Sequence, residues 1–276
     1  SLSVKKMNAT QALIICPTRE LAVQIDKQVQ GFSYFLGLTS MAIYGGGDGD
    51  VFSLQKRALT QGCQIIVATP GKLISHLNLG YVKFDKVRHL VLDEADRMLD
   101  MGFYDDIQKI CRHLPKKRQN LMFSATMDPK IRKMANTILS EPKTINIALS
   151  KPAEGVEQSV YLAYEKQKIP LLNILLEKHS DFKTILIFTS VKRKVNDIVR
   201  SLKKAGKKAS GISSDLDQKE REKVLLAFSN KTLPILVATD VLSRGVDIKE
   251  IDMVINFDVP NDAADYVHRV GRTARA

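Results

Sequence analysis

The chain has 276 residues, of which 44% are hydrophobic and 26% charged, and its formal net charge is +12. This composition is typical of a globular protein and excludes a low-complexity chain. No apolar run approaches the roughly 20 residues that span a bilayer, and the first ten residues lack the apolar core of a signal peptide. We therefore expect a cytoplasmic protein. At about one domain per 100 to 200 residues, the length predicts two domains.

The positive charge favours a polyanionic partner, because cations that neutralise phosphates release condensed counterions. Basic clusters at 116–118 and 192–194, and lysine pairs beginning at 203 and 207, equally suit solvated helix faces. Charge alone therefore leaves nucleic-acid binding open. The three cysteines are odd in number and lack metal-ligand spacing, which favours buried reduced thiols over a disulfide or a zinc site: Cys16, Cys63 and Cys111.

Short apolar runs alternate with stretches of helical period along the whole chain. This alternation predicts βαβ crossovers and mainly parallel sheets covered on both faces. A polar Pro/Gly stretch at 150–155 interrupts the pattern, so we expect two α/β domains, residues 1–149 and 150–276. We expect helices at 166–179 and 191–206 and strands within 12–17, 40–45, 63–70, 89–95, 120–126, 144–149, 159–164, 184–190, 208–213, 234–240 and 252–259.

Ligands of open parallel sheets bind beyond the carboxyl ends of the strands, so the residues after each run are the candidates. In PTRELA (17–22), Thr18 can cap a helix whose first N–H groups, with Arg19, suit a phosphate. TPGKL (69–73) repeats this arrangement with Lys72, and glycines at 45–47 allow close approach of another backbone. Ordinary capped helix starts and a flexible turn explain these segments as well.

Two acids follow the apolar run that ends at residue 92. Asp93 is placed to hold Mg²⁺, and Glu94 is placed to orient or deprotonate an attacking water. Two acids at a helix N-terminus, where the dipole favours them, are the alternative. The hydroxyls of SAT (124–126) can bond to these carboxylates or cap the next helix.

The second half ends with two further candidate segments. In SRGVD (243–247), Asp247 is available to accept from a hydroxyl such as that of ribose. In HRVGRTAR (268–275), His268, Arg272 and Arg275 share one face at helical spacing, and paired guanidinium groups suit phosphate. A solvated basic helix looks similar.

Nine segments occur in one order, each near a strand exit: PTRELA, GG, TPGKL, DEAD, SAT, ILIFTS, QKER, ATDVLSRGVDI and HRVGRTAR. In this order they resemble the motifs of the DEAD-box ATP-dependent RNA helicases, and the resemblance covers almost the whole chain. YGGGDGD, the segment around DEAD, and SDLDQKER are most similar to the bacterial RhlE-like branch. The resemblance implies an α/β fold of two RecA-like domains, with ATP and Mg²⁺ as cofactors and RNA bound largely independently of sequence.

The resemblance also implies roles for single residues. Asp93 would coordinate Mg²⁺, Glu94 would activate water, Asp247 would contact ribose, and Arg272 and Arg275 would act as arginine fingers on the nucleotide. Asp96, Ser124, Thr126 and His268 would couple the two domains. The positions that would contact the RNA are Thr18, Arg19, Gly46, Thr69, Gly71, Lys72, Thr189, Gln218, Arg221 and Thr239.

The chain departs from the family pattern in several places. Lys72 replaces the usual arginine, Ser213 and Ser214 replace His-Gly, and Ala274 replaces a glycine. No G-x-x-x-x-G-K-[ST] phosphate loop occurs in the 276 residues. We therefore expect an internal fragment of a longer helicase, with weak ATP binding by itself and reduced stability of residues 1–149. A non-catalytic RNA clamp and a related superfamily 2 DNA helicase remain the alternatives.

Overall fold

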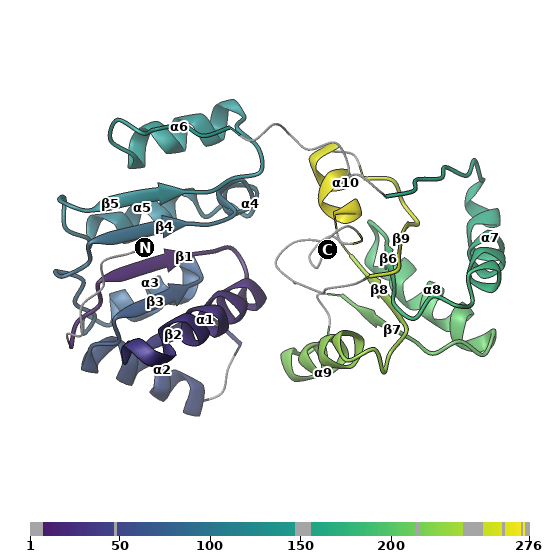
Figure 1. Cartoon of the computed structure of the whole chain (residues 1–276), viewed down its shortest axis with the longest axis horizontal. Helices are drawn as coiled ribbons and strands as arrows, with labels where there is room; N and C mark the ends of the chain where they lie inside the picture. Colours follow the sequence, from purple (N-terminus) through teal and green to yellow (C-terminus); the bar gives the residue numbers. More distant parts are fainter. Residues whose placement is uncertain are drawn as a thin grey trace. The chain divides into compact units, whose positions relative to one another are not determined.

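The computed structural model describes residues 8–46, 49–146, 156–213, 216–239, 251–260, 263–271 and 273. The chain divides into two compact units, Ser1–Asn146 and Ile147–Ala276, and each contains one parallel sheet flanked by helices (Figure 1). The predicted α/β fold is confirmed. Among the described helices, none is long and apolar enough to span a membrane.

The first unit follows the expected alternation of strands and helices. It contains β1 (Ala12–Ile15), α1 (Arg19–Ser33), the 3-10 turn η1 (Tyr34–Leu36), β2 (Ser40–Ile43), α2 (Gly49–Gln61), β3 (Ile65–Ala68), α3 (Pro70–Asn78), β4 (His89–Leu92), α4 (Ala95–Asp100), α5 (Tyr104–Arg112), β5 (Gln119–Met122) and α6 (Pro129–Ile138).

The strands of the first unit lie in the order β2-β3-β1-β4-β5, and every pairing is parallel. β1 is central, and all four of its residues are buried because helices cover both faces. Ala12 and Ile14 face α1, whereas Leu13 and Ile15 face the core formed with α2, α3 and α5. Burying a leucine or isoleucine side chain, such as Leu13 or Ile15, stabilises the unit by about 1.5–3 kcal/mol. β5 is an edge strand, and its residues are less buried than those of β1.

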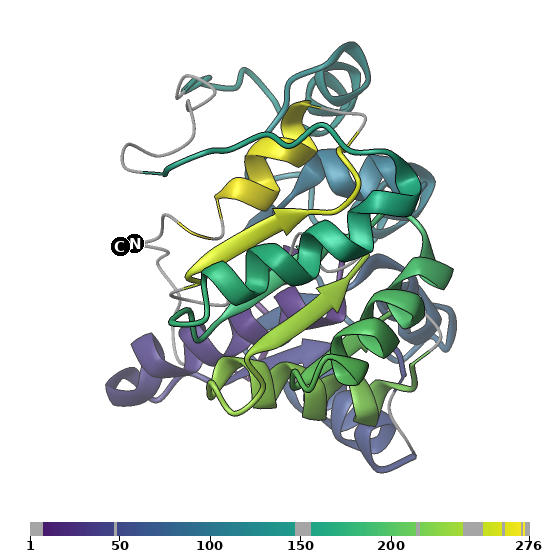
Figure 2. The ribbon, with the colours of Figure 1, turned by 90° about the vertical axis from the view of Figure 1, so that its right-hand side faces the viewer.

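The second unit repeats this architecture with four strands in the order β7-β8-β6-β9. Helices α7 and α8 cover one face, where Ile185 and Ile187 point, and α9 packs on Leu186 and Phe188 of the other face (Figures 1 and 2). The elements are α7 (Glu165–Lys178), β6 (Ile185–Phe188), α8 (Lys192–Lys204), β7 (Ala209–Ile212), α9 (Gln218–Ser229), β8 (Ile235–Ala238), β9 (Met253–Asn256) and α10 (Ala263–Val270).

One predicted strand is wrong. Residues 159–164 form a short apolar run of the kind expected for a strand, but they pair with no described strand, and Val160 and Leu162 are 88% and 100% exposed. An apolar run becomes a strand only where another backbone supplies hydrogen bonds. Tyr164 is instead the N-cap residue of α7, and its backbone N–H donates to Gln167 Oε1 (2.9 Å). Of the strand predicted at 144–149, residues 144–146 are not extended into a sheet, and the rest lie outside the described residues.

Candidate functional site

The candidate residues of the first unit gather along the carboxyl edge of its sheet. Since all strands are parallel, the segments that follow them emerge at the same edge in the order of the strands. The phosphate-binding candidates follow β2, β3 and β1, which are neighbours, whereas the acids follow β4 and the SAT segment follows β5. The edge therefore divides into a cationic part and an acidic part.

The turn after β4 holds the two acids in a constrained geometry. Asp93 N–H donates to Ile15 O (2.9 Å), Ala95 N–H donates to Phe123 O (3.0 Å), and Glu94 N–H donates to the Asp93 carboxylate (3.0 Å). Glu94 adopts the left-handed conformation (φ 49°, ψ 52°), which costs about 1–3 kcal/mol for a residue with a side chain. Its carboxylate makes no capping hydrogen bond to α4, although Glu94 is the N-cap residue of that helix, where the dipole favours an acid.

The acids lie in a partly desolvated and negatively charged environment. Burial raises the pKa of Asp93, the Glu94 N–H lowers it, and the Asp96 carboxylate raises it further. The pKa of the Cys16 thiol is raised by burial and then by Asp93 and Glu94, which places these acids beside the end of β1. Among the described residues, no three metal-ligating side chains are close enough to form a metal site by themselves. The concentration of carboxylates nevertheless favours a cation at this turn.

One hydroxyl of the SAT segment bonds to a carboxylate of the DEAD segment, which is Asp96 of α4 and neither Asp93 nor Glu94. Thr126 Oγ1 donates to the buried Asp96 carboxylate at 3.4 Å. The alternative, that SAT caps the next helix, is wrong, because Asp128 caps α6 by accepting from Ile131 N–H (2.8 Å). Ser124 Oγ is buried and has no hydrogen-bond partner within the described part of the chain.

Two of the RNA candidates meet directly at the cationic part of the edge. Arg19 donates to Gly46 O (3.2 Å), and its guanidinium lies 4.3 Å from the centre of the Tyr44 ring. Gly46 has φ 84°, a conformation that glycine adopts without strain. Thr18 is the N-cap of α1 and accepts from Leu21 N–H (3.3 Å), as expected for a capped helix start.

Around Lys72 the structure shows a cluster that the sequence pattern does not indicate. The Lys72 ammonium lies 4.7 Å from the centre of the Phe52 ring, and that ring stacks on His76. Nε2 of the fully buried His76 donates to Gln55 Oε1 (3.1 Å), and Nδ1 accepts from the Tyr81 hydroxyl. Burial, followed by the charge of Lys72, lowers the pKa of His76 to about 4, so this histidine is neutral near pH 7.

The other two candidates of TPGKL lie on the same helix. Thr69 is the N-cap residue of α3 and donates its N–H to Ile43 O (2.9 Å), although its side chain makes no capping bond. Gly71, in the first turn, has open space where a Cβ would lie. Gly46, Thr69 and Lys72 thus lie at the exits of adjacent strands, β2 and β3.

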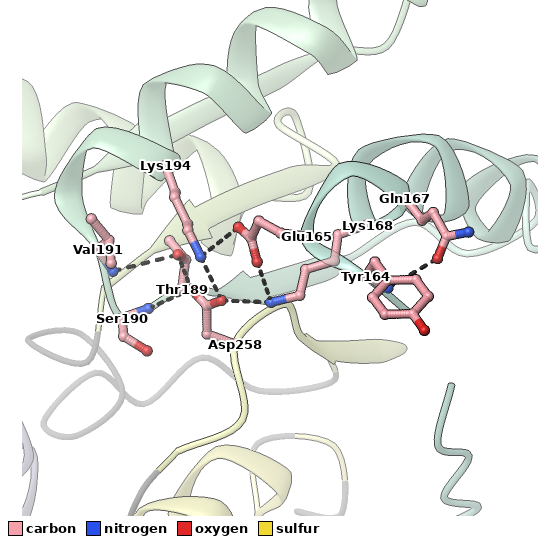
Figure 3. Close-up of polar contacts among 9 residues, drawn as sticks. All are labelled: Tyr164, Glu165, Gln167, Lys168, Thr189, Ser190, Val191, Lys194 and Asp258. Atoms are coloured by element: carbon pink, nitrogen blue, oxygen red, sulfur yellow. Dashed lines mark hydrogen bonds and ion pairs between the residues drawn. The ribbon is translucent and has the colours of Figure 1, made fainter. Parts of the chain in front are cut away.

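The second unit contains a charged network around Asp258, which follows β9 (Figure 3). Asp258 Oδ2 accepts from Thr189 Oγ1 (2.7 Å) and Ser190 N–H (3.1 Å), and Oδ1 accepts from Lys168 (3.0 Å) and Lys194 (2.9 Å). Both lysines also pair with the exposed Glu165 at the start of α7, at 3.0 and 2.7 Å. The hydroxyl of Thr189, an RNA candidate, is fully buried and donates its proton to this network.

The remaining candidates of the second unit are only partly described. Arg221 on α9 donates to Ser213 O (3.3 Å), and Thr239 is nearly buried at the exit of β8. The backbones of Gln218 and His268 lie in α9 and α10, but their side chains are outside the described residues. The described part of α10 ends at Val270, and three predicted nucleotide contacts are also outside: Asp247, Arg272 and Arg275.

Comparisons with known proteins agree with this arrangement. Residues 1–134 match the DEAD/DEAH box helicase family, and residues 167–276 match the helicase conserved C-terminal domain. The structure of Saccharomyces cerevisiae Dbp5 bound to RNA and ADP BeF3 superimposes with a TM-score of 0.82 at 30% identity, over 97% of this chain and 69% of that one. A DEAD box protein from the hyperthermophile Methanococcus jannaschii is 37% identical over 99% of this chain and 73% of its own, with a TM-score of 0.53.

The chain belongs to the DEAD-box helicase family. Its curated relatives include the ATP-dependent RNA helicase CshA of Listeria monocytogenes, which is 43% identical over 99% of this chain and 52% of the relative. The ATP-dependent RNA helicase DbpA of Escherichia coli is 41% identical over 97% of this chain and 58% of the relative. The chain therefore spans a little over half the length of these curated relatives.

In this DEAD-box chain, two residues that organise the second unit are not among the residues predicted from the sequence: Asp258 and Arg269. Asp258 stands at a strand exit, so the reasoning applied to Asp93 could have found it. Arg269, inside the HRVGR segment, is fully buried and donates to Asn256 Oδ1 (3.0 Å) and Asp258 O (2.8 Å). No local signal separates this structural arginine from its neighbours, because all of them lie in one basic motif.

Proposed function

We propose that this protein is an ATP-dependent RNA helicase, which hydrolyses ATP and couples hydrolysis to local separation of RNA duplexes or to remodelling of RNA–protein complexes. The proposal depends chiefly on the strained turn after β4, which presents Asp93 and Glu94 on the same sheet edge as Arg19, Gly46 and Lys72. The relatives named as ATP-dependent RNA helicases and the RNA-bound Dbp5 structure support it.

Mg²⁺ fits the acidic part of this edge. The ion prefers carboxylate oxygens and is usually held by one or two of them together with substrate phosphates and water. Asp93 would hold it, because a divalent cation would offset the burial and the charge of Asp96 that raise the pKa of Asp93. When bound, the ion would neutralise charge on the phosphates of ATP.

Glu94 would act as the residue that orients and deprotonates water. Its left-handed backbone ends the extended run of β4 directly after Asp93, so both carboxylates stand together at the exit of the strand. Asp96, Thr126 and Ser124 would link the acidic turn to the end of β5, where the Thr126–Asp96 hydrogen bond already connects two strand exits.

RNA would bind along the cationic part of the edge through its phosphates and sugars, so recognition would not depend on base sequence. Arg19 and Lys72 would supply charge, while Gly46, Gly71 and the N–H groups that begin α1 and α3 would allow close approach of the backbone. Since Thr189 donates its hydroxyl proton to Asp258, any contribution of this residue would come through the shape of the turn that follows β6.

The test is RNA-stimulated ATP hydrolysis by the full-length protein that contains these residues. Glu94→Gln removes the base while keeping the shape, so we expect hydrolysis to fall by about 10²–10⁴-fold with RNA affinity retained. Glu141→Gln is the matched control, because Glu141 is also a left-handed glutamate of the first unit (φ 45°) but lies after α6. RNA binding without any hydrolysis by the wild type would favour a clamp, and equal activity on duplex DNA would favour a DNA helicase.

We also propose that residues 1–149 and 150–276 are the two RecA-like domains, which separate expression of the two segments would test. Assignment to the RhlE-like branch and a cytoplasmic location remain predictions from the sequence. Comparison of full-length sequences tests the first, and cell fractionation tests the second.

A further inference from the structure

The positive charge of the second unit is concentrated in one segment. Residues 192–208 contain eight lysines and arginines and one acid, a net charge of +7 in seventeen residues. The rest of 147–276 contains fourteen cationic and sixteen acidic residues, a net charge of −2. The segment consists of α8 and the turn that follows it. The charge is therefore a local feature of one helix, which general basicity of the chain does not explain.

Helix α8 separates its apolar and cationic side chains onto opposite faces. Val195, Ile198 and Leu202 are buried against the sheet. The opposite face carries exposed cations three, four or seven residues apart, so that they form a row along the helix. We name this the α8 cationic row: Arg193, Arg200, Lys203 and Lys204.

Among the residues that the structure describes, few acids neutralise this row. Lys194, on the side of the helix, is already committed to Asp258 and Glu165. Arg200 lies 3.7 Å from Asp197, but the two side chains are 70% and 57% exposed, and such pairs contribute little in water. Within the described part of the chain, no ion pair involves Arg193, Lys203 or Lys204.

The row begins beside the carboxyl edge of the sheet in the second unit, where the RNA candidates Thr189 and Thr239 follow β6 and β8. α8 starts three residues after Thr189, at the carboxyl end of β6, and runs back along the sheet (Figure 1). From Arg193 to Lys204 the helix rises by about 16 Å at ~1.5 Å per residue. Arg200, Lys203 and Lys204 line a shallow depression with Asn196 and Val199. The row thus extends the strand-exit edge along the outside of the unit.

We propose that the α8 cationic row is an additional RNA-binding surface, which holds phosphates of an RNA segment that continues past Thr189. This inference rests on the proposed function. The surface recognises the backbone without reading bases, because it offers charge on flexible side chains and no exposed aromatic ring. At about 3.4 Å of rise per nucleotide, the row accommodates about five nucleotides beyond the edge site.

The experiment measures RNA affinity at several salt concentrations with two RNAs. The shorter RNA is the shortest one that binds with full affinity at the strand-exit edge, and the longer RNA extends it by about five nucleotides. The test variant is Arg193→Glu/Arg200→Glu. The control is Lys116→Glu/Lys117→Glu, which changes the net charge equally but lies before β5, away from the carboxyl edge of its sheet. Arg200→Gln/Lys204→Gln and Lys116→Gln/Lys117→Gln form a second, milder pair.

We expect the test variant to bind the longer RNA about 10-fold more weakly or worse, with the salt slope reduced by about one to two, while the control changes affinity less than about 3-fold. Binding of the shorter RNA should be nearly unchanged. Equal losses in test and control variants, or equal losses with both RNAs, would overturn the inference. If the wild type binds RNA and hydrolyses ATP, and the row variants bind RNA as tightly as the wild type, then the inference about the α8 cationic row is wrong and the proposed function stands. If the wild type neither binds RNA nor hydrolyses ATP, the proposed function itself is wrong.

Discussion

Replacing Asp258 with asparagine tests whether the charged network of Figure 3 stabilises the second unit. The Asp258 side chain is only 12% exposed and accepts hydrogen bonds from two lysines, one hydroxyl and one backbone N–H. Burial by itself would raise the pKa of Asp258, but the bonds from Lys194, Thr189 and Lys168 outweigh it and hold the pKa well below its usual range. Asparagine keeps the shape and removes the charge.

The expected loss of stability follows from the hydrogen bonds and ion pairs that the Asp258 carboxylate makes. Hydrogen bonds to charged groups contribute about 1.5–3 kcal/mol each, and removing one partner of a buried ion pair costs about 3–5 kcal/mol. Both lysines retain the exposed Glu165, which offsets part of this loss. We therefore expect Asp258→Asn to lower the free energy of unfolding of the second unit by about 3 kcal/mol and its Tm by about 10 °C.

The pH dependence gives a sharper signature. A carboxyl group whose pKa is lower in the folded state stabilises the protein fully above its unfolded pKa and loses this contribution as the pH falls. With an unfolded pKa of about 3.9, the difference between wild type and variant should be constant from about pH 8 to 5 and about 1.3 kcal/mol smaller at pH 3.

Urea denaturation followed by far-ultraviolet circular dichroism suits this chain, which contains no tryptophan, and calorimetry separates the transitions of the two units. Asp197→Asn is the control, because it removes an exposed aspartate of the same unit and should change stability by less than about 0.5 kcal/mol. A similarly small loss for Asp258→Asn at pH 7, or an undiminished difference at pH 3, would refute this account of the network.

Two further predictions concern the first unit. The pKa of His76 is lowered to about 4 in the folded state, whereas an unfolded histidine has a pKa of about 6.5. As the pH falls below about 6.5, the unfolded state therefore binds a proton at His76 before the folded state does. Between pH 7 and 4 this difference should lower the free energy of unfolding of the wild type by about 3 kcal/mol. His76→Gln should remove that part of the pH dependence in urea titrations, and an unchanged profile would contradict the neutral histidine. Gly62→Ala should destabilise by about 3 kcal/mol, because its Cβ would lie 2.1 Å from the carbonyl carbon of Asn8 in a backbone with φ 92°. Gly80→Ala, with φ 77° and open space, should cost only about 1 kcal/mol, and equal losses in thermal denaturation would show that the contact with Asn8 is not the cause.

The sequence predicted the strands of the sheets well because their signal is local. Runs such as Ala12–Ile15 and Ile185–Phe188 are apolar at every position, which is the pattern of a parallel strand covered on both faces. In a parallel sheet the segments that follow the strands emerge at one edge, which predicted where the functional side chains lie. Arg19, Gly46 and Lys72 do lie at one edge of the first sheet. The strand predicted at 159–164 shows the limit of predicting strands from apolar runs, since a run does not by itself supply a pairing partner.

Local sequence also determined the cationic face of α8, because residues three and four apart share a face of any helix. What only the tertiary structure decided are contacts between residues far apart in the chain. Thr189 and Asp258 are 69 residues apart, and their hydrogen bond exists because β6 and β9 are neighbours in the sheet. Strand order fixes which exits meet, and no local pattern encodes it. The hydroxyl of Thr189 is therefore committed to an internal carboxylate for a reason that becomes visible only when the sheet is assembled.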